Sequence, residues 1–154
     1  MIEIVPLSQI APARIEALLD EAFGPDRHMR TAYRLREGVE AVPKLSFAAI
    51  DGDRLAGTLQ SWPVALRCDD GTCVPMTLVG PVAVDPGLQR GGIGRILMAK
   101  LIEAAEAHGR DALMMIGDPE YYGRFFKFTA DATGGWILPG PVERHRLLAL
   151  IGRP

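Results

Sequence analysis

Apolar residues recur along the chain with two different periods, and each period predicts a kind of element. Residues 12–23 carry them at the three-to-four-residue spacing of one helix face, and Gly24 ends the run. Residues 93–109 repeat that spacing over a longer stretch and close on Gly109. Residues 78–84 form instead a continuous apolar run rich in valine, which is typical of a buried strand.

Along the whole chain these patterns predict a strand, two helices, three antiparallel strands, a long helix, a strand, a short helix and two final strands. The expected strands are residues 2–7, 45–50, 55–66, 74–84, 112–116, 136–138 and 146–151. The expected helices are residues 12–23, 27–36, 93–109 and 121–126. Hairpins join most strands and one helical crossover follows Val84, so we predict a single α+β domain over residues 1–154.

The segment Gln89-Arg90-Gly91-Gly92-Ile93-Gly94 lies between a predicted strand and the long helix. Its glycines allow several backbone N–H groups to converge, and the helix N-terminus adds unpaired donors and a positive dipole end, so the segment suits a phosphate or pyrophosphate. A P-loop would need a Lys-Ser/Thr pair where Arg95-Ile96 stands. A dinucleotide-binding turn would need a small residue where Leu97 stands.

This segment resembles the Q/R-x-x-G-x-G/A signature of the GNAT superfamily of acyl-CoA-dependent N-acyltransferases, matched by Gln89, Gly92 and Gly94. The order of elements resembles the GNAT fold over essentially the whole chain. The resemblance implies a mixed, mostly antiparallel central sheet flanked by helices, with acetyl-CoA as cofactor. The residues it implies for binding acetyl-CoA are Val82, Ala83, Val84, Gln89, Arg90, Gly91, Gly92, Ile93, Gly94, Arg95, Asp118, Tyr121 and Phe125.

Residues 117–125, Gly-Asp-Pro-Glu-Tyr-Tyr-Gly-Arg-Phe, and residues 138–141, Leu-Pro-Gly-Pro, resemble a bacterial GNAT subgroup. The resemblance gives Tyr122 the role of the acid that protonates the departing thiolate, with Tyr121 as the alternative. The other interpretation is that both rings are core side chains. The match departs at residues 126–128, where one residue is extra and Lys127 stands at an expected glycine, and Asp118 replaces an asparagine that contacts the pantetheine arm in many members. A shifted turn or a misaligned Tyr122 would follow.

The sequence leaves two further parts of the chemistry undecided: the hydrogen-bond donors to the thioester and the base that deprotonates the amine. The amides of Val82 and Val84 would be available to a thioester if the neighbouring strand diverges there, as it does in the family, and Gly80-Pro81 marks an irregular position. The base that deprotonates an attacking amine has three candidates: Glu40, Asp85 and His28. Asp85 is most simply a turn residue.

Arginines gather in residues 27–36, the helical region that lines the acceptor site in GNAT proteins. They are Arg27, Arg30, Arg34 and Arg36. A solvated helix face explains them most simply. If they point inward, they imply an acceptor that carries a carboxylate or phosphate.

Composition and charge limit the partners and the cellular location that we expect for this protein. The chain has 154 residues, 48% of them hydrophobic and 23% charged, and its net charge of −2 favours neither nucleic acid nor an anionic membrane as partner. No apolar stretch approaches the ~20 residues of a membrane span, and the N-terminus has no signal-peptide pattern, so we expect a cytoplasmic monomer or homodimer. Cys68 and Cys73 are expected as free thiols, and no Cys or His pattern predicts a metal site.

The sequence thus predicts an N-acetyltransferase that moves an acetyl group from acetyl-CoA to a primary amine of a small molecule or peptide by direct attack. The alternative is a non-catalytic acyl-CoA sensor of the same fold. A protein-interaction domain without a CoA site is a third and weaker hypothesis.

Overall fold

A computed structural model describes residues 1–110 and 112–151, with residues 89–91 described by their backbone alone. Within these described residues, six strands form one sheet in the order β1 to β6. Neighbouring strands are antiparallel except β4 and β5, which are parallel. The predicted mixed, mostly antiparallel sheet is confirmed. The strands are β1 (Ile2–Pro6), β2 (Phe47–Asp51), β3 (Arg54–Arg67), β4 (Cys73–Val84), β5 (Ala112–Ile116) and β6 (Leu147–Ile151).

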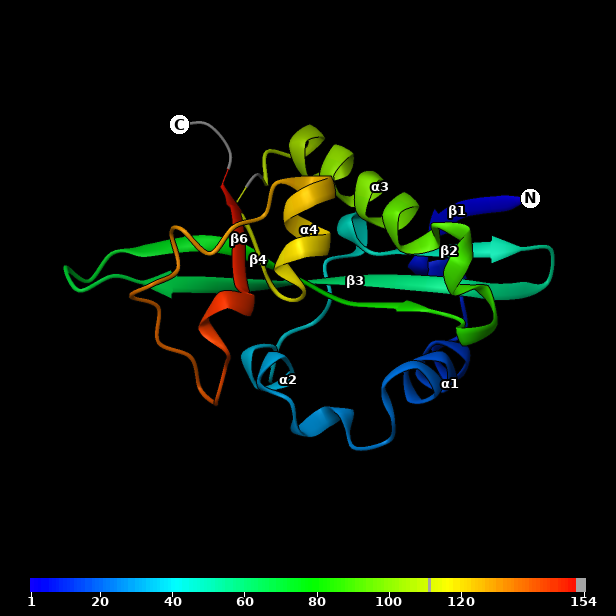
Figure 1. The fold of residues 1–154 in the computed structure, drawn as a ribbon, viewed down its shortest axis with the longest axis horizontal. Helices are drawn as coiled ribbons and strands as arrows, with labels where there is room; N and C mark the ends of the chain where they lie inside the picture. The colour runs from blue at the N-terminus through cyan, green and yellow to red at the C-terminus, as the bar shows by residue number, and fades with distance from the viewer. Residues whose placement is uncertain (111, 152–154) are drawn as a thin grey trace.

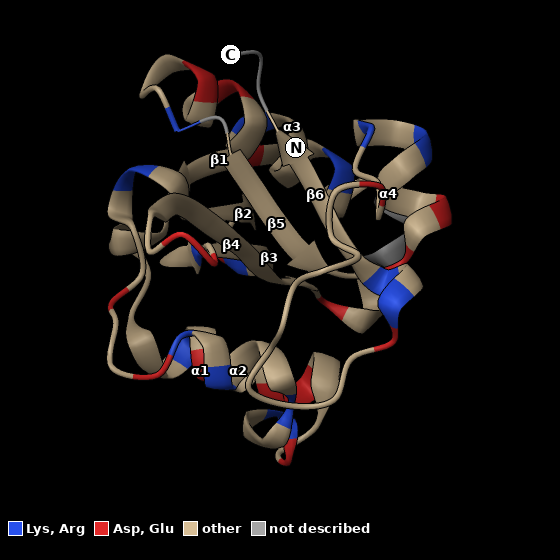
Figure 2. Cartoon of the chain, turned by 90° about the vertical axis from the view of Figure 1, so that its left-hand side faces the viewer, with Lys and Arg blue, Asp and Glu red and all other residues tan. Residues whose placement is uncertain are grey.

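In the part of the chain that the structure describes, four α-helices cover the two faces of the sheet, α1 and α2 on one and α3 and α4 on the other (Figure 1). They are α1 (Pro12–Phe23), α2 (Thr31–Leu35), α3 (Ile93–Ala107) and α4 (Pro119–Phe126). Helix α3 is the predicted crossover between β4 and β5, and it ends before Gly109, whose φ is 67°. Charged residues of both signs are interspersed on the helices and loops, and the strands are mostly uncharged (Figure 2).

The α3 side of the sheet carries the larger hydrophobic core. Leu97, Met98 and Leu101 of α3 are fully buried against the sheet. A Cβ atom on Gly57 of β3 would lie 2.9 Å from both Ala83 O and Ile93 Cγ2, so the close approach of α3 to β3 requires a glycine there. No helix in the described part of the chain combines the length and apolarity that a membrane crossing needs.

Two predicted elements were wrong. Residues 136–138 lie in an irregular segment rather than a strand, and Trp136 and Leu138 pack against a buried cluster that includes Leu147. The predicted helix 27–36 is divided into a 3₁₀ turn (Arg27–Met29) and α2, because Arg30 between them is extended, with φ −70° and ψ 149°. Cys68 and Cys73 are free, as expected.

Candidate active site

Strands β4 and β5 separate soon after they meet. Among the described residues, which exclude Asp111, they pair only through Thr77 with Leu113 and Leu78 with Met114. Beyond Leu78, β4 continues its pairing with β3, through a register shift at which Gly80 and Pro81 lie opposite the single residue Gln60. The predicted irregularity and strand divergence are therefore both present, and they open a gap in the sheet between β4 and β5.

The end of β4 presents two backbone amides to this gap. The amide of Asp85 donates to Ala56 O on β3 at 2.8 Å. Successive amides of a strand point to alternate edges, and residues 82–84 pair regularly with β3, so the amides of Val84 and Val82 face the β5 side. Ala83 presents its amide to β3. This alternation leaves Val82 and Val84 as the donors at the gap.

The glycine-rich segment forms a tight turn at the start of α3. Residues Pro86–Gly91 make a 3₁₀ turn, and Gly92 follows in the left-handed conformation with φ 70°. The first helical bond runs from Ile96 N to Gly92 O, so the amides of Ile93, Gly94 and Arg95 are left without intrahelical acceptors. Only the backbone is described for Gln89, Arg90 and Gly91. The predicted contacts of the Gln89 and Arg90 side chains with the cofactor therefore lie outside the described residues.

Three of the predicted binding side chains meet beside this turn. A Cβ on Gly94 would lie 3.5 Å from Tyr121 Oη, so the phenol of Tyr121 lies over the first turn of α3. The Tyr121 ring packs on that of Phe125 at 5.3 Å between centroids. The guanidinium of Arg95 lies 4.8 Å from the centre of the Phe125 ring. These residues of α3 and α4 form one edge of the turn.

Tyr122 faces a different environment from Tyr121. A Cβ on Gly117 would lie 2.8 Å from Tyr122 Cε2, so the ring lies directly against the backbone at the end of β5. Burial raises the pKa of Tyr122 to about 12, with smaller contributions from Tyr121 and Asp118. The hydroxyl therefore keeps its proton throughout the physiological pH range.

The departure from the family pattern after Tyr122 is accommodated at one residue. Lys127 caps α4 in the left-handed conformation with φ 66°, which a glycine adopts more readily. Its amide donates to Gly123 O at 3.1 Å, the bond of an αL cap. The helix thus keeps its register through Phe126, and Tyr122 stays on the inner face of α4, where its ring packs 6.4 Å from that of the buried Phe128.

A cavity of about 850 Å³ runs through the gap. Its wall includes Val79 and Met115 of the core on the α3 side, and Tyr122, which packs against that core. It also includes Leu78 of the buried cluster that contains Leu147, on the α2 side, and Ile116, which packs against that cluster. The cavity therefore reaches both faces of the sheet at the point where β4 and β5 part.

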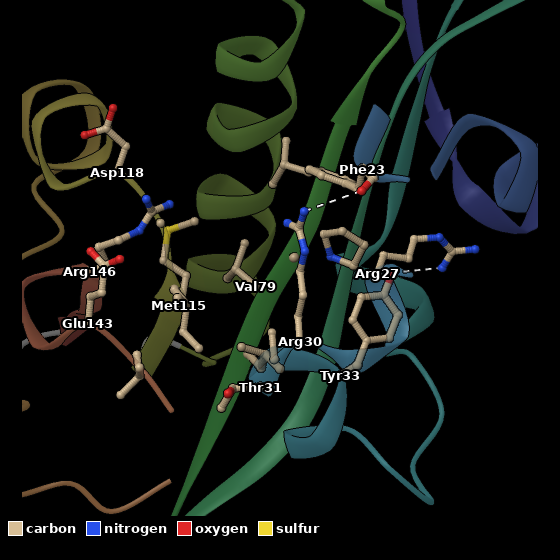
Figure 3. Close-up of a pocket in the computed structure, with 18 of the residues that line it drawn as sticks. Phe23, Arg27, Arg30, Thr31, Tyr33, Val79, Met115, Asp118, Glu143 and Arg146 are labelled. Atoms are coloured by element: carbon tan, nitrogen blue, oxygen red, sulfur yellow. Dashed lines mark hydrogen bonds between the residues drawn. The ribbon is translucent and has the colours of Figure 1, made fainter. Parts of the chain in front are cut away.

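The wall contains charged residues that lie far apart in the sequence. Arg27, Arg30, Asp118, Glu143 and Arg146 line it (Figure 3). Asp118 was predicted to bind acetyl-CoA, and Arg27 and Arg30 were expected to bind an anionic acceptor only if they pointed inward. Asp118 caps α4, where one carboxylate oxygen accepts from Glu120 N at 2.9 Å. Glu143 and Arg146 reach the cavity through the tertiary fold, and no local sequence pattern marks them.

The three candidate bases stand elsewhere. The carboxylate of Asp85 accepts from Gly87 N at 2.9 Å and pairs with Arg54 at 3.0 Å. The hydrogen bond from Gly87 is the main cause that lowers the pKa of Asp85. Asp85 is therefore the predicted turn residue and a weak base. His28 packs its ring against Tyr33, and Glu40 is exposed. Neither lines the cavity within residues 1–110 and 112–151.

The interpretation of the arginines as one solvated face was wrong for Arg27. Its side chain is 3% exposed and pairs with both Glu16 and Asp20. Arg36 is half-buried, with its guanidinium 3.6 Å from the centre of the Tyr33 ring and 4.2 Å from that of Trp62. Arg30 and Arg34 are exposed, and Arg30 lines the cavity.

Comparisons with known proteins agree with this architecture. The family described as "Acetyltransferase (GNAT) domain" matches residues 8–125. The "Uncharacterized N-acetyltransferase YhbS" of Escherichia coli strain K12 is 30% identical over 112 residues, which are 72% of this chain and 64% of that relative. This chain therefore spans less than two thirds of the length of that relative.

Two solved structures share the fold. The GNAT family N-acetyltransferase YhbS from Escherichia coli, in complex with CoA, aligns with a TM-score of 0.69 and 22% identity, covering 97% of this chain and 79% of that one. A GNAT family acetyltransferase from Brucella melitensis, in complex with acetyl-CoA, aligns with a TM-score of 0.65 and 24% identity, covering 97% of this chain and 95% of that one.

Proposed function

We propose that this chain, which belongs to the GNAT acetyltransferase family, transfers the acetyl group of acetyl-CoA to a primary amine of a small molecule or peptide by direct attack. The observation that carries the proposal is a cavity at the β4–β5 gap whose lining includes residues from both faces of the sheet. An acyl donor can enter from the α3 side, beside the glycine turn, and an amine from the α2 side. The solved structures bound to CoA and acetyl-CoA support the choice of donor.

The residues of the glycine turn fit the pyrophosphate of acetyl-CoA. The amides of Ile93, Gly94 and Arg95 open the first turn of α3, where the helix dipole favours an anion. Arg95 and Phe125 stand at its edge. Acetyl-CoA would supply an activated thioester. The amides of Val82 and Val84 would then hydrogen-bond to the pantetheine arm and to the thioester oxygen, which gains negative charge during acyl transfer.

Tyr122 serves best as a hydrogen-bond donor to the sulfur of the leaving thiolate. Its pKa of about 12 keeps the donor proton in place at neutral pH. A thiol has a pKa of about 8.5, so complete proton transfer from this phenol would be uphill by roughly 5 kcal/mol. Stabilisation of the thiolate through a hydrogen bond avoids that penalty, and the thiolate of CoA then takes its proton from buffer acids in bulk solvent after it leaves the site. Tyr121, beside Gly94, is placed instead for the phosphate end of the donor.

An attacking amine must lose its proton first, because an alkylammonium has a pKa of about 10.4. Asp118 and Glu143 are the carboxylates that line the cavity within the described residues. Either can accept the proton directly or through water. We therefore place the base at this pair rather than at Asp85, which is not among the described residues that line the cavity.

Release of free CoA tests the proposal. The protein would be incubated with acetyl-CoA and a panel of amines, polyamines and peptides, and calorimetry would measure CoA affinity in parallel. Acetyl transfer predicts both tight CoA binding and amine-dependent release. Tight CoA binding without turnover on any amine would favour the sensor, and no CoA binding would remove the donor site.

A further inference from the structure

Charged residues line the cavity in two groups. Asp118 and Glu143 lie at one end, with Arg146, and Arg30 lies across the cavity from them, with Arg27 beyond it (Figure 3). Apolar side chains, including Val79 and Met115, line the space between them. A molecule that bridges the cavity therefore meets a carboxylate end, an apolar middle and a guanidinium end.

Arg27 does not contribute free positive charge to the guanidinium end. Its Nη2 pairs with Glu16 at 3.0 Å and its Nε with Asp20 at 3.1 Å, while Nη1 donates to Tyr33 Oη at 3.0 Å. Two carboxylates thus surround one buried guanidinium. Arg27 fixes the ring of Tyr33 and the start of α2, and it has little capacity left for an anionic ligand.

Arg30 has that capacity. Its guanidinium stacks 5.4 Å from the centre of the Phe23 ring, and Nη2 donates to Phe23 O at 3.4 Å. Within residues 1–110 and 112–151, no carboxylate forms an ion pair with it. The ring and the carbonyl restrict the side chain while most of its N–H donors stay available. This is a suitable geometry for binding an oxyanion.

Arg146 is less suited to that role. It shares its end of the cavity with Asp118 and Glu143, and its charge acts on Tyr122, whose pKa it lowers slightly against the larger effect of burial. An anion bound there would compete with the cavity's own carboxylates. Like Arg30, Arg146 forms no ion pair in the described part of the chain, but Arg30 is the one that lies away from the cavity's carboxylates.

We infer that the acceptor is an amine that carries a carboxylate or phosphate at the far end of an apolar chain. Its amino group lies toward Asp118 and Glu143, near Tyr122, and its anionic group binds Arg30. The inference rests on the proposed function and names the substrate class of that same site. A simple alkylamine would fill the apolar middle and leave Arg30 without a partner.

Pairs of acceptors matched in length test this. β-Alanine, γ-aminobutyrate and ε-aminocaproate would be compared with propylamine, butylamine and hexylamine, and phosphoethanolamine with ethanolamine. The readouts are kcat/KM for CoA release and affinity for the CoA-saturated protein by calorimetry. We expect the anionic member to be favoured by about 10- to 100-fold, the range for a hydrogen bond to a charged group, at one preferred chain length. The carboxylate and phosphate arms separate the two anions.

Variants test whether Arg30 causes the preference for anionic acceptors. Arg30→Gln should remove this preference, and Arg30→Lys should keep part of it because the charge remains. Arg34→Gln is the matched control, since it removes the same charge from α2 where the guanidinium reaches Pro139 O instead. That variant should leave the preference unchanged.

Three results would overturn the inference. They are equal use of anionic and plain amines, an unchanged preference in Arg30→Gln, and an equal loss in Arg34→Gln; each leaves acetyl transfer itself standing. Absence of turnover with every acceptor would instead overturn the proposed function. In that case the calorimetric preference on the CoA-saturated protein, and its dependence on Arg30, still decides the inference.

Discussion

At the scale of single residues, the two adjacent tyrosines of α4 have separate surroundings. Tyr122 lines the cavity, and the hydroxyl of Tyr121 lies beside Gly94. Tyr122→Phe keeps the ring and should preserve CoA affinity while lowering kcat by about 100- to 1,000-fold, as for the loss of one preorganised donor. Tyr121→Phe should change kcat little. Steady-state kinetics with calorimetric CoA affinities would check this, and exchanged phenotypes would move the donor to Tyr121.

The pKa of Tyr122 makes a separate prediction about pH. Because its pKa is raised to about 12, the phenol stays protonated and able to donate at every pH where the protein is assayed. The rate should rise with pH as the acceptor amine loses its proton, and tyrosine ionisation should add no alkaline decline up to about pH 10. A decline near pH 9 in the wild type that disappears in Tyr122→Phe would contradict this.

Lys127 allows a prediction about stability. A left-handed backbone costs a non-glycine residue roughly 1–2 kcal/mol, and glycine avoids that cost at the end of a helix. The side chain of Lys127 is exposed, so Lys127→Gly should stabilise the fold by about 1 kcal/mol. Lys127→Ala keeps the strain and is the control. Thermal or urea unfolding gives the comparison, and a less stable glycine variant would show that the lysine makes a compensating contact.

At the scale of elements, the turn into α3 is the proposed pyrophosphate site. Gly94→Asp places a carboxylate at the first helical turn, where it suits the helix dipole but repels a phosphate. A Cβ there meets nothing closer than 3.5 Å, so the fold should persist.

The expected effect of Gly94→Asp is loss of CoA binding. In the wild type, CoA at 100 times its Kd should stabilise by about 2.7 kcal/mol, which raises Tm by roughly 5–11 °C for a chain of this size. Gly94→Asp should abolish this shift. Gly94→Asn, equal in size and uncharged, should retain part of it, and an undiminished shift in a folded Gly94→Asp protein would place the phosphates elsewhere.

The elements with a clear period could be predicted from sequence, and those held by tertiary contacts could not. Helix α3 follows from its apolar spacing and its closing glycine. Residues 136–138 have the composition of a strand, yet Trp136 and Leu138 gain their burial by packing from a loop onto the cluster that includes Leu147. The sequence around Arg30 also gives no local signal that the predicted helix 27–36 is divided there. The side chain of Arg27 is held inward by ion pairs with Glu16 and Asp20 of α1, which are tertiary contacts.

At the scale of the whole molecule, the candidate site joins local motifs to distant residues. The glycine turn and the Tyr121-Tyr122 pair were visible in the sequence because each lies within one short segment. The acceptor end was visible only in part: Arg30 lies in the arginine-rich segment that the family resemblance places at the acceptor site, whereas Glu143 meets the cavity only when the segment before β6 folds over the same gap. Lining residues that depend on this closure carry no spacing that a sequence pattern can reveal.

The central claim is that donor and amine occupy the cavity together and react directly across the β4–β5 gap. Initial rates over a grid of acetyl-CoA and acceptor concentrations test it. Direct transfer within a ternary complex predicts double-reciprocal lines that intersect. Parallel lines, together with an acetylated form of the protein in mass spectra after incubation with acetyl-CoA alone, would show a covalent enzyme intermediate and contradict the account.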